Sequence, residues 1–143
     1  MPITSARRAL GLAAALWIAG LPGATRAGEA VAAALTAQDI VGTYRGELWS
    51  DGVMRDATTR FYLDSEGRLT GAYDYDEDGT TQAGILIKPQ ISTSGEVTFI
   101  WQDKFGFGTL TISFFKDFSQ FAGMWSTLED GADAFPWFGK RAK

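Results

Sequence analysis

From Ile40 onward, apolar and polar residues alternate one by one, which is the period of a β-strand with one buried face. In residues 68–76 the alternation places Leu69, Gly71, Tyr73 and Tyr75 on one face of a predicted strand. Further strands are predicted at residues 40–50, 57–63, 83–88, 97–101, 109–114, 121–125 and 135–141. In residues 83–88 the pattern assigns Ala83, Ile85 and Ile87 to one face and ends the strand before Pro89.

One short pattern, a glycine and an aromatic residue on one face followed by an Asp-Gly turn, occurs three times. The copies are Gly42-Thr43-Tyr44 with Asp51-Gly52, Gly71-Ala72-Tyr73 with Asp78-Gly79, and Gly123-Met124-Trp125 with Asp130-Gly131. The spacing from aromatic residue to turn is two residues longer in the first copy, so the aromatic side chain keeps its face. Asp-Gly between two strands is typical of a tight hairpin turn. We interpret these glycines as sites of packing and curvature rather than as ligand contacts.

Seven or eight short strands with short connections predict an all-β fold, an antiparallel up-and-down meander. Parallel crossovers are excluded because they need a dozen or more residues. A small closed barrel buries one face of such a sheet without helices and leaves no edge strand, whereas a two-sheet sandwich is the alternative. The barrel domain is assigned to residues 40–143, and residues 28–39 to a linker or short N-terminal helix.

Residues 1–27 have the features of a secretory signal peptide. Arg7 and Arg8 precede an apolar stretch, and small residues surround Arg26 at the expected cleavage site. The apolar stretch is shorter than a membrane span of about 20 residues. We therefore expect a periplasmic or secreted protein with no membrane span after the signal is removed.

Composition narrows the possible functions. The chain contains no cysteine and no histidine, which excludes catalytic triads that use histidine and the usual His/Cys sites for zinc or haem. Without the three arginines of residues 1–27, ten basic and 17 acidic residues remain, a net charge of −7. Nucleic acids and anionic membranes attract basic surfaces, so neither is an expected partner. We predict no cofactor and a protein that is not an enzyme.

Several residues resemble those of the calycin group of barrels, which includes lipocalins and avidins. A short turn or helix before Gly42 and Tyr44 resembles the lipocalin start, where the aromatic residue is Trp, and Arg141 stands where that group carries an arginine over the first-strand aromatic. Residues 67–73 and 98–101 resemble avidin strands. The resemblance implies a barrel whose mouth or interior holds a small apolar ligand.

The acidic run that begins at Asp74 offers a candidate metal site. Asp74, Asp76 and Asp78 followed by glycine match the start of a calcium-binding loop. The twelfth position of such a loop would be Ile85, where an EF-hand has glutamate, and no flanking helices are expected. The other interpretation is a solvated hairpin turn.

The many aromatic residues support two functional hypotheses. In the first, the barrel binds a small apolar or aromatic ligand inside, through Tyr44, Tyr73, Trp101 and Trp125; the same rings could instead fill the core. In the second, the protein is an accessory subunit or inhibitor of an envelope protein and acts through surface aromatic residues. The residues of this second hypothesis are Trp49, Phe105, Phe107, Trp137 and Phe138.

Overall fold

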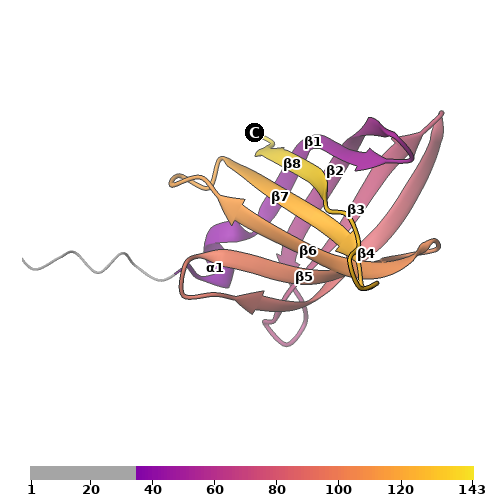
Figure 1. Ribbon diagram of the computed structural model, residues 1–143. Coiled ribbons are helices and arrows are strands. Elements are labelled where there is room, and N and C mark those ends of the chain that lie inside the picture. Colours follow the sequence, from indigo (N-terminus) through magenta and orange to yellow (C-terminus); the bar gives the residue numbers. More distant parts are fainter. Residues whose placement is uncertain (1–34) are drawn as a thin grey trace, which may run out of the picture. The chain divides into compact units, whose positions relative to one another are not determined.

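The computed structural model describes residues 35–143, and these form one eight-stranded barrel with a short helix (Figure 1). The predicted signal peptide and most of the predicted linker lie outside the described residues. The elements are α1 (Ala37–Ile40), β1 (Gly42–Ser50), β2 (Val53–Leu63), β3 (Leu69–Glu77), β4 (Thr80–Ile91), β5 (Glu96–Asp103), β6 (Gly106–Phe114), β7 (Gln120–Thr127) and β8 (Phe135–Arg141).

Each strand pairs with the next in antiparallel fashion, and β8 returns to pair with β1. The indigo β1 and the yellow β8 therefore lie side by side, with Tyr44 opposite Arg141 (Figure 1). This confirms the predicted closed up-and-down meander and excludes the sandwich. The fold is consistent with the calycin group.

The alternation along the chain explains why these segments fold as strands with one face inside. Alternate apolar residues of β3, β5 and β6 lie inside, among them Tyr73, Phe99 and Ile112, each at most 3% exposed. Polar residues at the intervening positions lie partly or wholly in solvent. The predicted shared face of Leu69, Gly71, Tyr73 and Tyr75 is the inward face of β3.

The predicted face of β4 is wrong. Ala83 and Ile85 are exposed, and the inward positions are Gln82, Gly84 and Leu86. Gly84 is needed because a Cβ atom there would collide with the ring of Tyr73. The strand also continues past Pro89, because the pairing with β5 shifts register between Ile87 and Gln90.

Two of the three Asp-Gly pairs form the expected tight turns. Asp51 and Gly52 join β1 to β2, and Asp78 and Gly79 join β3 to β4, all with positive φ. Both central residues of a type I′ turn require positive φ, which glycine and aspartate tolerate better than most residues. The third pair lies in the longer connection between β7 and β8.

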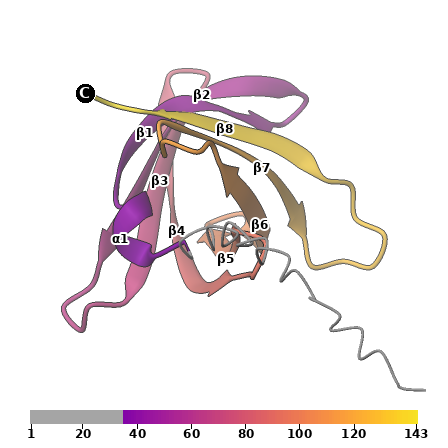
Figure 2. The same cartoon turned by 90° about the vertical axis from the view of Figure 1, so that its left-hand side faces the viewer.

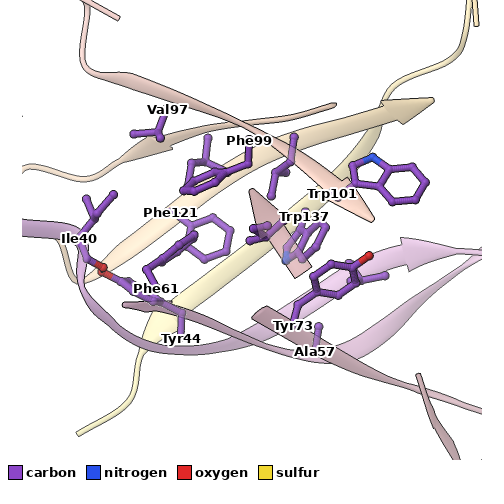
Figure 3. Packing of buried hydrophobic residues seen from close by; sticks show 14 of the residues in the cluster. Ile40, Tyr44, Ala57, Phe61, Tyr73, Val97, Phe99, Trp101, Phe121 and Trp137 are labelled. Carbon is purple, nitrogen blue, oxygen red and sulfur yellow. The ribbon is translucent and has the colours of Figure 1, made fainter. Parts of the chain in front are cut away.

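The end of the barrel next to α1 is closed by side chains. The Tyr44 hydroxyl donates a hydrogen bond to the Ile40 carbonyl oxygen at 3.1 Å. The Tyr44 ring packs edge-on against Phe61 and Phe121, with centroids 5.5 and 5.4 Å away. Figure 2 shows α1 at this end, and Figure 3 shows Tyr44, Phe61 and Phe121 gathered near Ile40.

Arg141 fastens this closed end. Its guanidinium lies over the Tyr44 ring, 4.9 Å from the centroid, as the resemblance to calycins implies. The guanidinium also donates hydrogen bonds to the carbonyl oxygens of Asp39, Val41 and Phe118 at 2.9, 2.6 and 3.0 Å. One side chain therefore joins the last strand to the segment around α1 and to the β6–β7 turn.

Candidate functional site: an aromatic cavity at the open end

The opposite end of the barrel contains a cavity of about 470 Å³. It opens beside the β1–β2, β3–β4 and β5–β6 turns. Its rim includes Asp51 and Phe105 from two of these turns and Glu77 from the end of β3. A volume of several hundred Å³ is typical of pockets for small organic molecules. The lining residues are Leu48, Trp49, Ser50, Asp51, Tyr73, Tyr75, Glu77, Trp101, Asp103, Phe105, Trp125 and Trp137.

The deepest aromatic residues of the lining are packed against one another. Trp137 is 2% exposed and meets the Tyr73 ring edge-on, with centroids 4.7 Å apart. Trp101 and Trp125 meet edge-on at 5.3 Å. Figure 3 shows Tyr73, Trp101 and Trp137 together, away from the group around Tyr44. Such contacts fix the ring planes, so the cavity wall is rigid before any ligand enters.

The indole N–H groups of three lining tryptophans are already used. Trp101 donates to the Ser126 carbonyl oxygen at 3.0 Å, and Trp125 donates to the Trp49 carbonyl oxygen at 3.1 Å. Trp137 donates to the Thr59 hydroxyl oxygen at 3.0 Å. These side chains therefore offer ring surfaces rather than hydrogen-bond donors to a molecule in the cavity.

Tyr73 and Asp103 form the main polar contact of the site. The Tyr73 hydroxyl donates to a carboxylate oxygen of Asp103 at 2.8 Å. Burial raises the pKa of Tyr73 far above its ordinary value, and its hydrogen bond to the nearby Asp103 carboxylate adds to this effect. The tyrosine is thus a neutral donor at all physiological pH values, and the other Asp103 oxygen accepts from the Phe105 N–H group at 2.8 Å.

The structure brings three of the four predicted ligand-binding residues together. Tyr73, Trp101 and Trp125 all line the cavity. Tyr44 does not line it, because its side chain is completely buried at the closed end, between α1 and Arg141. Of the aromatic residues in the surface hypothesis, Trp137 is buried in the core, whereas Phe105, Phe107 and Phe138 are exposed.

Sequence reasoning missed the polar part of this site. Tyr75 and Glu77 follow Tyr73 at two-residue steps, and Asp103 follows Trp101 by two. Because side chains two apart share a face of a strand, extending each inward face to the strand end identifies all three. In this barrel the last inward residues of β3 and β5 form part of the cavity wall.

The structure does not bring the three candidate calcium ligands together. Asp74 forms an ion pair with Arg60. Asp78, in the tight turn after β3, forms an ion pair with Arg55. Within residues 35–143, no group of three acidic side chains is placed to hold a metal ion. The acidic run is therefore a hairpin with two ion pairs.

Comparisons with protein-family models, with curated proteins and with solved structures found no match to this chain. Among the helices within the described part of the chain, none has the length and apolar character needed to cross a membrane.

Proposed function

We propose that this protein is an exported, non-enzymatic barrel that binds a small apolar or aromatic ligand in the cavity at its open end. The observation that carries the proposal is the wall of mutually packed aromatic rings around about 470 Å³ of space. A barrel with no ligand to bind would be more stable with its interior filled by side chains, since an unfilled cavity lowers the free energy of unfolding. A relationship to the calycin group is part of the same proposal, because that resemblance implies a barrel that holds a small apolar ligand in its mouth or interior.

Two features support binding rather than catalysis. The wall consists mainly of aromatic side chains whose polar atoms are used within the protein. In the principal side-chain pair, Tyr73 with Asp103, the tyrosine hydroxyl stays neutral and gives no tyrosinate nucleophile at physiological pH. This arrangement suits retention of an apolar body by contact area.

The test uses N-phenyl-1-naphthylamine, a neutral apolar probe whose fluorescence rises in an apolar site. We expect saturable binding with one probe per protein. Trp125→Ala removes one wall of the cavity and should weaken the affinity about tenfold, since losing an aromatic contact costs roughly 1–2 kcal/mol. Phe138→Ala, on the exposed outer side of β8, is the matched control and should leave binding unchanged.

Native mass spectrometry of the protein purified from its own host gives a second, independent readout. A co-purifying small molecule that is lost from Trp125→Ala would support the proposal. Absence of saturable probe binding together with no co-purifying molecule would overturn it.

The alternative is an accessory subunit or inhibitor of an envelope protein. Phe105 in the β5–β6 turn and Phe107 at the start of β6 are 61% and 57% exposed and support this alternative. It predicts that Phe107→Ser abolishes capture of a single envelope protein, whereas Trp125→Ala leaves capture intact. The cavity proposal predicts no dependence of function on Phe107, because this residue is not part of the lining.

A further inference from the structure

The charged residues of the cavity all have one sign. Its lining includes Asp51, Glu77 and Asp103 but no lysine or arginine. Among the ion pairs within residues 35–143, none involves these three carboxylates. Asp103 accepts hydrogen bonds from the Tyr73 hydroxyl and the Phe105 amide, both of which are neutral donors. None of the three carboxylates therefore forms an ion pair with a described residue. The hydrogen bond to Asp78 raises the pKa of the Arg55 guanidinium, and Glu77 and Asp51 lie close enough to add to this effect.

Two basic residues near the mouth offset only part of this charge. Arg55 is turned toward the β3–β4 turn, where its Nη1 atom lies 2.8 Å from an Asp78 carboxylate oxygen. The Lys104 ammonium lies over the outer, exposed ring of Phe105, 4.8 Å from its centroid. Neither residue belongs to the lining of the cavity. With Asp78 included, four carboxylates and two cations leave the mouth with a net negative charge.

The aromatic wall favours the same sign of ligand charge. The ring faces of tryptophan and tyrosine carry partial negative charge and attract ammonium groups within about 6 Å. Because the N–H groups of Trp101 and Trp125 donate to backbone carbonyl oxygens, the positive edges of these two rings are already used within the protein. Aromatic rings and three carboxylates therefore line one volume.

We infer that the ligand of this cavity is a small organic cation, with an aromatic or apolar body against the tryptophans and an ammonium group beside Asp103 and Glu77. This inference rests on the proposed function above and specifies the class of ligand. The body accounts for contact area, and the ammonium group supplies the positive charge that the mouth lacks. A carboxylate ligand of the same shape is disfavoured because it would face Asp103 directly.

The test compares three ligands that share one ring system and differ in charge. They are naphthalen-1-ylmethylammonium, naphthalen-1-ylmethanol and 1-naphthoate, measured by isothermal titration calorimetry at pH 7 and low salt. We expect the ammonium to bind about tenfold more tightly than the alcohol, the effect of one charge-assisted contact. The carboxylate should bind most weakly. Added salt should narrow the difference between the ammonium and the alcohol, since it screens exposed charges.

Two variants assign the effect to the mouth. Asp103→Asn keeps an oxygen that can accept from the Phe105 amide, and it should reduce the ammonium-to-alcohol affinity ratio about fivefold to tenfold. Glu77→Gln should reduce this ratio by a smaller factor, because Glu77 lies at the rim. Asp56→Asn and Glu96→Gln are matched controls on exposed positions outside the cavity, and they should leave the ratio unchanged.

The outcomes separate this inference from the proposed function. Equal binding of the ammonium and the alcohol, with N-phenyl-1-naphthylamine still bound, overturns the charge preference and leaves the apolar site standing. The charge preference is overturned in the same way if Asp103→Asn and Asp56→Asn change the ratio equally. Failure of all three ligands and of the neutral probe overturns both the inference and the proposed function.

Discussion

Replacing Arg141 with methionine tests how the closed end is held together. The change keeps most of the apolar stem but removes three hydrogen bonds, to the carbonyl oxygens of Asp39, Val41 and Phe118. A net contribution of about 1 kcal/mol per bond, with roughly 0.5–1 kcal/mol for the contact with the Tyr44 ring, gives a loss of about 3–4 kcal/mol. For a domain of this size, that loss lowers Tm by at least roughly 12 °C.

Urea unfolding followed by tryptophan fluorescence and by circular dichroism measures this loss. Lys140→Met, at the neighbouring exposed position of β8, is the control for removal of one positive charge and should change the free energy of unfolding by less than about 0.5 kcal/mol. Arg141→Lys should fall between the two, because a single ammonium cannot reach three carbonyl oxygens in different segments. Equal free energies of unfolding for Arg141→Met and Lys140→Met would show that the contacts of Arg141 do not stabilise this end.

Two further predictions concern the inward face around Tyr73. Gly84→Ala places a Cβ atom against the Tyr73 ring and should lower the free energy of unfolding, measured in urea, by about 1–3 kcal/mol. The control Ala83→Gly, at the exposed neighbouring position, should lower it by less than about 1 kcal/mol. Equal losses for the two variants would contradict the close approach of Gly84 to Tyr73. Burial raises the pKa of Tyr73 in the folded protein above the unfolded-state value of about 10. Above that pH the unfolded chain loses the tyrosine proton while the folded protein keeps it, so the folded state loses stability as the pH rises. The free energy of unfolding should therefore fall as the pH rises above about 10, and Tyr73→Phe should flatten this slope; an unchanged slope would refute the assignment.

The alternation of apolar and polar residues predicted the fold because turn-forming residues follow the alternating segments in the sequence. β8 was placed at Phe135–Arg141, as observed, since a loop of small and acidic residues precedes it. The same alternation predicted the wrong buried face for β4. Its alternating Ala83, Ile85 and Ile87 resemble a buried face, but the ring of Tyr73 occupies the space inside, so only glycine fits opposite it. Which face of a strand is buried is decided by its neighbours across the sheet, and no single strand contains that information.

The position of each ring along the barrel follows from a spacing that the sequence does show. Tyr73 and Trp125 each lie five residues before their Asp-Gly pair, whereas Tyr44 lies seven residues before its own. Those two extra residues keep Tyr44 on the inner face but move it about 7 Å further from the mouth along its strand, at the rise of a β-strand. Tyr44 consequently reaches the layer of Phe61 and Phe121, where rings fill the barrel, while Tyr73 and Trp125 stop at the layer that lines the cavity. One repeated unit thus contributes to both layers, and the length between ring and turn decides whether the ring packs the core or lines the cavity.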